Sequence, residues 1–199
     1  SPIGHDLGFK STFKGNGHAI KNLFISRASP TSPYDQDYIG LFGSVKGALI
    51  NDLKITGEAT RIEGDDIVGA IAGTGYNSTL SEVYVRAEVY GDITVGGIIG
   101  GIRDGLVEKS ISESRVFGNT RVGGIAGGIQ GGLIRDSVSN SNVTGSEHVG
   151  GVAGSVLSNF DYHLEPSQYT PQIQHCFATG DVGSSADSNT VGGLVGYLY

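Results

Sequence analysis

A short signature of hydrophobic residues and glycines occurs six times in this chain and constrains its fold more than any other feature. The six copies occupy residues 39–43, 68–73, 95–100, 122–127, 149–154 and 191–196. Their closing glycines are 30, 27, 27, 27 and 42 residues apart. A nearly fixed period of this size is typical of repeat proteins, in which each unit is stabilised by packing on its neighbours.

A second repeated block follows each glycine signature. It begins at Ile50, Leu80, Val107, Ile134 and Ile173, and residues 20–25 resemble an earlier copy. Nine residues after each start, the last four copies have Val89, Val116, Val143 and Val182, and we expect Ala59 to take this place in the first complete copy. Relative to the copy before it, the last unit carries twelve extra residues before Ile173 and three after Val182, which predicts a loop insert at about 158–172.

From Leu53 onward, small or apolar residues alternate with polar ones, as in strands with one buried face. Helices are disfavoured, because each glycine in a helix interior costs roughly 1 kcal/mol. The sequence therefore predicts an all-β parallel β-helix (β-solenoid) with about 27 residues per coil and about seven coils. We expect it to be right-handed, as parallel crossovers usually are. We expect residues 1–199 to form a single domain that is part of a larger protein.

Composition excludes several classes of protein. The 34 glycines show no Gly-X-Y period, which excludes collagen, and a hydrophobic content of 38% excludes wholesale disorder. The net charge of −7 and the lack of a basic run disfavour nucleic acid as a partner. No apolar run is long enough to predict direct membrane insertion. Cys176, the single cysteine, falls at a repeat core position, so we expect it to be a small packed residue.

Residues 13–23, 39–43, 176–180 and 191–196 resemble the GLUG repeat family, which is named for its Gly-Leu-any-Gly signature. The resemblance covers nearly the whole chain, apart from the insert. It implies a secreted or surface-anchored bacterial protein, like adhesin-like proteins and the non-catalytic regions of IgA-specific metallopeptidases. It supplies no catalytic residue.

The sequence predicts no catalytic, cofactor-binding or metal site. The His-Glu-x-x-His motif of zinc peptidases is absent. A glycosidase or lyase would need acids and bases converging on one surface. One outward column of such groups changes in composition from copy to copy, as a solvated face would: Asn22, Asp52, Glu82, Lys109, Asp136 and His175. We therefore expect no enzyme.

Loop aspartates offer an alternative for a bound ion. Carboxylate oxygens are typical calcium ligands, and four aspartates fall at expected turns: Asp35, Asp37, Asp65 and Asp66. The helix-loop-helix calcium loop and the calcium-binding nonapeptide repeat are both missing. A structural role in turns is therefore favoured over calcium binding.

Two features favour binding. An outward column is mostly apolar, and exposed apolar area commonly marks an interaction surface: Phe24, Lys54, Tyr84, Ile111, Val138 and Phe177. Alternatively, the long insert folds back over this column. The insert also contains Phe160, Tyr162 and Tyr169, which are suited to stacking on sugars.

Four hypotheses for the function follow. The first is a non-catalytic extracellular scaffold or adhesin segment, with a protein or glycan on a host, a neighbouring cell or the matrix as partner. The second is a carbohydrate-binding or polysaccharide-processing module, and the third is a filament subunit that associates end to end. Ice binding would need a regular threonine array, which one column interrupts: Thr94, Arg121, His148 and Thr190.

Overall fold

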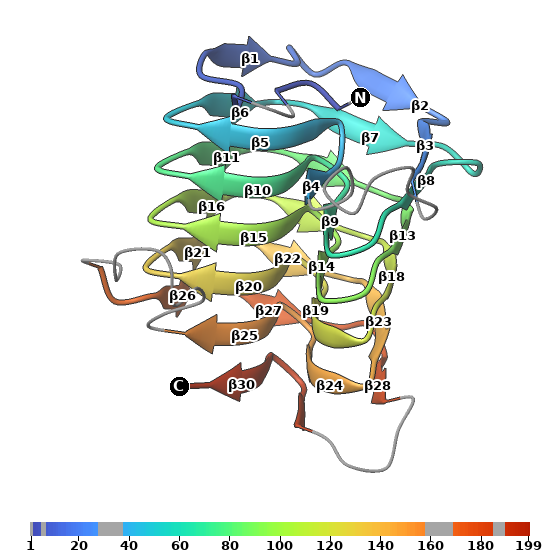
Figure 1. The fold of residues 1–199 in the computed structure, drawn as a ribbon, viewed down its shortest axis with the longest axis vertical. Coiled ribbons are helices and arrows are strands. Elements are labelled where there is room, and N and C mark those ends of the chain that lie inside the picture. The colour runs from blue at the N-terminus through green and yellow to red at the C-terminus, as the bar shows by residue number, and fades with distance from the viewer. Residues whose placement is uncertain (1, 5–6, 28–37, 158–168, 185–189) are drawn as a thin grey trace.

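The computed structural model of the chain is a stack of short parallel strands (Figure 1). It describes residues 2–4, 7–27, 38–157, 169–184 and 190–199, and every structural statement below concerns these residues. They contain 30 strands in five parallel sheets, here named A to E, and no helix. This confirms the prediction of an all-β parallel β-solenoid.

Three sheets form the outer walls. Sheet B contains β1 (Thr12–Lys14), β6 (Leu49–Asn51), β11 (Thr79–Ser81), β16 (Leu106–Glu108), β21 (Leu133–Arg135) and β26 (Gln172–Gln174). Sheet C contains β2 (Ala19–Lys21), β7 (Lys54–Thr56), β12 (Tyr84–Val85), β17 (Ile111–Ser112), β22 (Val138–Ser139) and β27 (Phe177–Ala178). Sheet D contains β3 (Phe24–Ser26), β8 (Arg61–Glu63), β13 (Glu88–Tyr90), β18 (Arg115–Phe117), β23 (Asn142–Gly145) and β28 (Val182–Ser184).

The other two sheets carry the glycine signature. Sheet E contains β4 (Tyr38–Ile39), β9 (Ile67–Gly69), β14 (Thr94–Gly96), β19 (Thr120–Gly123), β24 (Glu147–Gly150) and β29 (Val191–Gly192). Sheet A contains β5 (Phe42–Lys46), β10 (Ala72–Tyr76), β15 (Ile99–Arg103), β20 (Ala126–Gln130), β25 (Ala153–Leu157) and β30 (Val195–Leu198).

Each coil passes through sheets B, C, D, E and A in that order. Every sheet has six strands, so the described residues form six coils rather than about seven. The N-terminal segment adds two single bridges on the first coil, where Ile3 pairs with Phe42 and Phe9 pairs with Val45. None of the described residues forms a helix that is long and apolar enough to cross a membrane.

The strand register confirms most of the repeat alignment and corrects it in the first two coils. Val89 pairs with Ile62, so the prediction that Ala59 takes this place was wrong, and Ala59 is exposed. The extra residues of the second coil lie between β7 and β8, so Ile62 takes the place in the alignment that was predicted for Ala59. In the first coil, Ile20 pairs with Ile55 rather than with Ile50.

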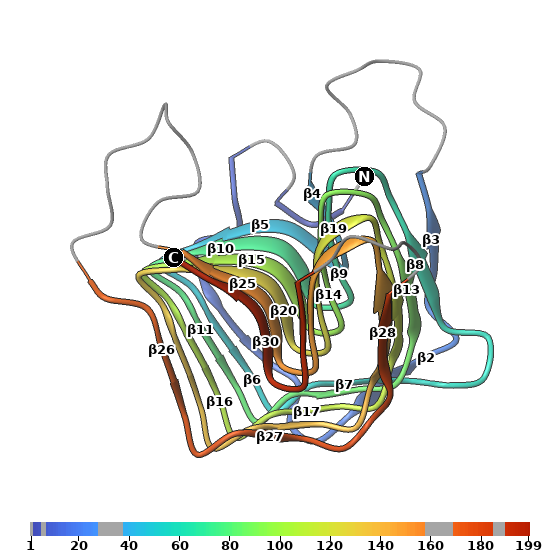
Figure 2. The same cartoon turned by 90° about the horizontal axis from the view of Figure 1, so that it is seen from below.

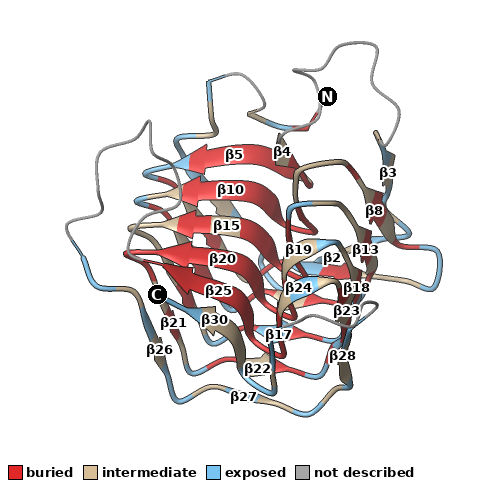
Figure 3. Ribbon diagram, turned by 60° about the horizontal axis from the view of Figure 1, so that its bottom comes forward, coloured by how far each residue is buried: buried red, intermediate tan, exposed pale blue. Residues whose placement is uncertain are grey.

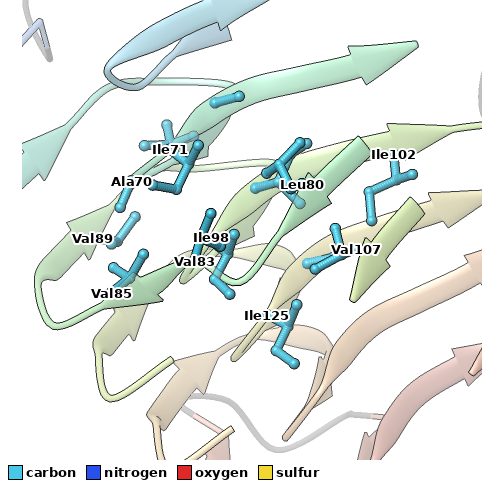
Figure 4. Close-up of a cluster of buried hydrophobic side chains, with 14 of the residues drawn as sticks. Ala70, Ile71, Leu80, Val83, Val85, Val89, Ile98, Ile102, Val107 and Ile125 are labelled. Atoms are coloured by element: carbon cyan, nitrogen blue, oxygen red, sulfur yellow. The ribbon is translucent and has the colours of Figure 1, made fainter. Parts of the chain in front are cut away.

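Sheets E and A give the coil a re-entrant cross-section (Figure 2). After sheet D the chain reverses, so that sheet E runs back beside sheet D, and it then turns sharply into sheet A. Only two residues join the two sheets, as at Ala70 and Ile71 between β9 and β10. Ile71 is fully buried, and its equivalents Ile98 and Ile125 also point into the core (Figure 4).

The closing glycines of the signature allow sheet A to touch the backbone of sheet E. A Cβ atom on Gly127 in β20 would lie only 2.5 Å from the backbone nitrogen of Val95 in β14. A Cβ atom on Gly154 in β25 would lie 2.4 Å from the carbonyl carbon of Arg121 in β19. In both cases a strand of sheet A lies against sheet E of the preceding coil. The signature therefore marks a backbone-to-backbone contact that no side chain can enter.

Apart from the last strand, β30, the strands of sheet A are mostly buried (Figure 3). Strands of sheet B instead alternate, with one buried residue between two partly exposed ones. One face of sheet A packs on the core, and the other is covered by sheet E near the turn that joins the two sheets. The core itself consists of stacked aliphatic side chains, such as Leu80 and Val107 in sheet B (Figure 4).

Buried serines replace aliphatic residues on the inner side of the later coils, and several of them bond to the backbone. The Ser110 hydroxyl accepts a hydrogen bond from the Val83 amide at 3.3 Å and donates one to the Glu108 carbonyl at 2.7 Å. Ser137 repeats both bonds one coil later. Cys176 follows in the same column, and its thiol donates to the Gln174 carbonyl at 3.2 Å. This packing agrees with the expected structural role of the cysteine.

Two glycines in or next to the signature provide a test, because Gly127 is enclosed by backbone atoms and Gly101 faces open space. We expect Gly127→Ala to lower the free energy of unfolding by about 2–3 kcal/mol, because its methyl group overlaps backbone atoms. Gly101→Ala is the matched control, since its Cβ atom would meet only Thr74 Oγ1 at 3.8 Å. Urea denaturation should show no loss for this variant, and an equal loss in both variants would contradict the explanation.

A second pair of variants tests the inner serines. Ser110→Ala removes the acceptor of the buried Val83 amide, so we expect it to lower the free energy of unfolding by about 1–3 kcal/mol. The Ser139 hydroxyl is buried with no hydrogen-bond partner. Ser139→Ala should therefore be neutral or stabilising in the same denaturation experiment. A larger loss for Ser139→Ala than for Ser110→Ala would refute this account of the inner serines.

Candidate binding groove between sheets A and E

Sheets A and E diverge from the sharp turn that joins them (Figure 2), and a hollow lined by both sheets, here named the groove, lies between their outer faces. Sheet E contributes one column of groove-facing residues, namely Tyr38, Ile67, Thr94, Arg121, His148 and Thr190. Sheet A contributes two columns. The inner one is Ser44, Thr74, Gly101, Gly128, Ser155 and Tyr197, and the outer one begins Lys46, Tyr76, Arg103, Gln130 and Leu157.

A cavity of about 210 Å³ lies in this groove across the first four coils. Its walls come from both sheets and from the turn between sheets D and E. The lining residues are Tyr38, Asp66, Ile67, Thr74, Tyr76, Ile93, Thr94, Gly101, Ile102, Arg103, Arg121 and Gln130. The cavity thus combines tyrosine rings, aliphatic side chains, hydroxyl and amide groups, and charges of both signs.

Burial affects the charged groups of the groove. Arg103 is largely buried, and its Nε atom lies 4.0 Å from Oδ2 of Asp104. Burial lowers the pKa of the Arg121 guanidinium. Because arginine starts from such a high pKa, it stays charged, and the groove holds a poorly hydrated cation.

Past the cavity, His148 fills the groove toward the last coil. Its ring stacks on Tyr197 with the centroids 4.4 Å apart, and Tyr197 stacks in turn on Tyr199. Burial lowers the pKa of His148, the Glu147 carboxylate opposes this effect, and the charge of Arg121 lowers it further. The His148 Nδ1 atom and the Ser155 hydroxyl are both buried with no hydrogen-bond partner. This end of the groove is therefore closed by aromatic packing.

Three aspartates meet at the turns between sheets D and E, beside the cavity. Carboxylate oxygens of Asp65, Asp66 and Asp92 lie within 4.8 Å of one another. The backbone carbonyls of these residues also hold the turns together: the Asp66 carbonyl accepts hydrogen bonds from the amides of Ile93 and Thr94. The structure thus adds Asp92 to two of the four aspartates considered for calcium. Asp35 and Asp37 lie outside the described residues.

The apolar column expected on the outside is present on sheet C, with one correction. Lys54, Tyr84, Ile111, Val138 and Phe177 pair in register across five coils. Phe24 does not belong to this column, because it pairs with Arg61 in sheet D, and Ala19 takes the expected place. The error follows from the shifted alignment of the first coil.

Side chains of the sheet C column are open to solvent. Ile111 is 38% exposed and Phe177 is 55% exposed, while the Tyr84 hydroxyl donates a hydrogen bond to Glu113. Tyr169 of the insert is exposed as well. Phe160 and Tyr162 lie outside the described residues, so the alternative that the insert covers this column is untested.

The polar column considered for catalysis forms a corner instead of a convergent site. Five of its members adopt left-handed backbone conformations, with φ between 49° and 56°: Asp52, Glu82, Lys109, Asp136 and His175. They follow directly on the strands of sheet B and turn the chain into sheet C. Asn22 has a similar φ of 55° but lies at the next corner, between sheets C and D.

The groove was not predicted from the sequence, although the sequence contains two patterns that relate to it. The column of Thr94, Arg121, His148 and Thr190 was considered only as an interrupted threonine array, and the structure places it on one wall of the groove. The last residues of successive strands in sheet A have long side chains, for example Tyr76, Arg103 and Gln130. Neither pattern indicates that the two columns face each other.

The fold and the groove define a parallel β-solenoid with a lateral cleft. No protein-family model and no curated protein sequence matches the chain. Among solved structures, the chain is similar to a protein from Bacteroides ovatus described as a "putative immunoglobulin A1 protease". The TM-score is 0.63 at 16% identity, over 92% of this chain and 70% of that chain. At this identity the likeness shows a shared fold alone.

The partly buried imidazole of His148 predicts a pH dependence of stability. Because the pKa of His148 is lowered in the folded state, the unfolded chain binds more protons as the pH falls below the ordinary histidine value of about 6.5. Stability should therefore decrease through this window, and His148→Asn, which tolerates the φ of 51°, should lose less.

Urea denaturation at pH 7.5 and pH 5.5 measures this difference. His175→Asn controls for the backbone effect of asparagine, because His175 is exposed and has the same φ of 51°. Equal losses in the wild type and His148→Asn would contradict the assignment.

Proposed function

We propose that this chain is a non-catalytic scaffold segment of a secreted or surface bacterial protein, and that it acts as an adhesin by presenting fixed side-chain columns to a partner. The observation that carries the proposal is the set of five parallel sheets, each of which continues through all six coils. Each coil is hydrogen-bonded to its neighbours on every side, so outward residues are held in straight rows on a stiff frame.

Two outward surfaces are suited to adhesion. One is the column on sheet C, where Ile111 and Phe177 expose apolar area on a strand face. The other is the groove between sheets A and E, which is hollowed and lined by mixed polar and aromatic groups. They lie on different sides of the coil, so one segment can contact two partners (Figure 2).

Two resemblances support an extracellular setting. The glycine signatures resemble GLUG repeats, which occur in secreted or surface-anchored bacterial proteins. The name of the Bacteroides ovatus neighbour refers to an immunoglobulin, which is an extracellular protein. We extend this setting to the chain as part of the proposal.

The non-catalytic part of the proposal rests on what the acidic groups do. Asp52, Glu82 and Asp136 occupy left-handed corners, and the Asp65 and Asp66 carbonyls hold turns. Each of these residues thus has a structural role in the coil. We also propose that the three clustered aspartates stabilise the turns between sheets D and E and do not hold a resident calcium ion.

A binding experiment with product analysis tests the scaffold proposal. The labelled chain is passed over surfaces coated with mucin, collagen, fibronectin and bacterial exopolysaccharide. We expect reversible retention on at least one surface and no change in the mass of the coating material by mass spectrometry. Retention on none of the surfaces, or release of cleavage products, would contradict the proposal.

The sheet C column is tested in the same experiment by combining Ile111→Thr, Val138→Thr and Phe177→Thr. Threonine is β-branched, which strands favour, and it removes most of the apolar area at each position. We expect retention on the protein coatings to fall about tenfold, which corresponds to about 1.4 kcal/mol. Glu113→Thr with Asn140→Thr, at the exposed positions that directly follow β17 and β22, is the matched control and should keep full retention.

A carbohydrate-binding module is the second candidate, and the groove cavity is the observation that favours it. Sugar sites commonly combine a ring or aliphatic wall with a few directed polar groups, and this cavity contains both. The two candidates are compatible, since an adhesin can recognise a glycan.

A further inference from the structure

The outer face of sheet D carries a stack of flat groups that stops partway along the solenoid. The rings of Tyr90 in β13 and Phe117 in β18 lie at an angle of 9°, with their centroids 4.8 Å apart. From the preceding coil, the Arg61 guanidinium lies over the Tyr90 ring, with its carbon atom 4.1 Å from the centroid. Because Arg61 and Phe117 belong to the coils on opposite sides of Tyr90, both faces of the tyrosine ring are covered.

The stack ends at Phe117, because the next two positions in its column have a short side chain and none. Phe117 pairs in register with Thr144, and Thr144 pairs with Gly183. A Cβ atom on Gly183 would meet nothing within 4 Å. A shallow hollow of about 390 Å³ lies here, and Phe117 is among its lining residues whereas Tyr90 is not. Phe117 thus has Tyr90 on one side of its ring and the hollow on the other.

Polar groups in fixed positions line the same hollow. The Asn142 Oδ1 atom accepts a hydrogen bond from the backbone amide of Asp181 at 3.1 Å, which holds the side-chain amide in one orientation. Its Nδ2 group is then a donor, and the carboxylate of the exposed Asp181 is an acceptor. Thr144 adds a hydroxyl group, which can donate and accept. The hollow therefore combines one apolar ring face with donors and acceptors beside it.

The charges around the hollow favour a neutral ligand. Arg115 and Asp181 line it with opposite signs. The Arg115 guanidinium is already paired, because its Nη1 atom lies 3.3 Å from Oε1 of Glu88. An acidic ligand would be repelled by the Asp181 carboxylate, and a basic ligand would be repelled by Arg115. Neither sign of charge therefore gains a clear advantage in this site.

A pyranose ring meets these requirements. Its C–H face is apolar and covers a phenyl ring, while the hydroxyl groups around its edge act as both donors and acceptors. An aromatic side chain of a protein partner would cover Phe117 equally well, but it would leave the Asn142 amide and the Asp181 carboxylate without hydrogen bonds, which is unfavourable. The strand spacing of about 4.8 Å is close to a stacking distance, so a sugar over Thr144 would continue the stack by one step.

We propose that the hollow at the end of the Tyr90–Phe117 stack binds one neutral pyranose residue of a glycan, which stacks on the Phe117 ring and forms hydrogen bonds with Asn142 and Asp181. This inference rests on the proposed adhesive function and specifies the chemistry of one partner. The site is separate from the groove, because sheet D lies on the other side of sheet E (Figure 2). It is also distinct from the apolar column on sheet C.

Ligand-observed NMR titration with neutral disaccharides tests the proposal. Lactose, cellobiose and maltose present different pyranose faces, and N-acetyltyrosinamide represents an aromatic partner. We expect saturable binding of at least one disaccharide in the millimolar range, which suits a small contact area, and weaker binding of the aromatic probe. Absence of saturable binding for all three disaccharides, or tighter binding of the aromatic probe, would overturn the proposal.

Two pairs of variants then place the binding site. Phe117→Leu removes the ring face and keeps an apolar side chain, so we expect at least a tenfold loss of affinity. Tyr90→Leu is its matched control, because it breaks the same stack without touching the hollow, and it should stay within threefold of the wild type. Gly183→Leu fills the hollow from a position with open space around its Cβ atom and should also lose tenfold. Gly101→Leu adds the same side chain in the groove and should bind like the wild type.

The outcomes separate this inference from the proposed function. Loss of sugar binding in Gly101→Leu and not in Gly183→Leu would place the sugar in the groove and overturn the site on sheet D. Equal losses in Phe117→Leu and Tyr90→Leu would contradict stacking on Phe117. In both cases, retention on the coated surfaces would still support an adhesive scaffold, whereas shortened sugar products would contradict the non-catalytic function itself. Circular dichroism and urea denaturation check that each variant is folded.

Discussion

The structure depends on one contact, in which the backbone of sheet A lies directly against the backbone of sheet E from the preceding coil. This contact involves five glycines of sheet A, each with a Cβ position within 2.9 Å of a backbone atom of sheet E: Gly73, Gly100, Gly127, Gly154 and Gly196. The contact folds the coil inward and so creates the groove. It also links successive coils by packing as well as by the parallel ladders. A side chain at any of these points would push sheets A and E apart, and the lateral cleft would lose its floor.

Two adjacent glycines of one repeat have different surroundings. Gly100 and Gly101 are adjacent and chemically identical, yet the first is enclosed by backbone and the second faces open space. Packing constrains the first glycine, and the second leaves open space in the groove. The serines of the inner wall show a similar division, because Ser110 is bonded to the neighbouring coil and the Ser139 hydroxyl has no partner. Residues that are tightly held by their neighbours and residues that are not therefore occur side by side within one repeat.

The sequence was sufficient to predict the fold class and most of the register, because the aliphatic residues recur at fixed spacing and alternate with polar ones. It was insufficient in the first two coils. Three extra residues near Gly57 can be placed at several corners without changing the spacing of the glycines, which is why Ala59 was aligned in place of Ile62. Phe24 was misplaced for a related reason. The groove could not be predicted, since alternation shows that Arg121 and Arg103 point outward but not that their sheets turn toward each other. That arrangement is a property of the two-residue turn between sheets E and A.

Each strand of sheet A packs against sheet E of the preceding coil. This offset of one coil affects how the groove surface can change by mutation or duplication of repeats. Each coil supplies one residue to each column of the groove, and opposite walls come from neighbouring coils. Duplicating one repeat would therefore lengthen the cleft by one strand spacing, about 4.8 Å, and would leave the existing recognition positions in place. Exchanging one outward residue would alter a single rung of the cleft and nothing in the core. A protein built in this way can acquire a longer or different binding surface by copying and editing its coils, without redesigning its fold.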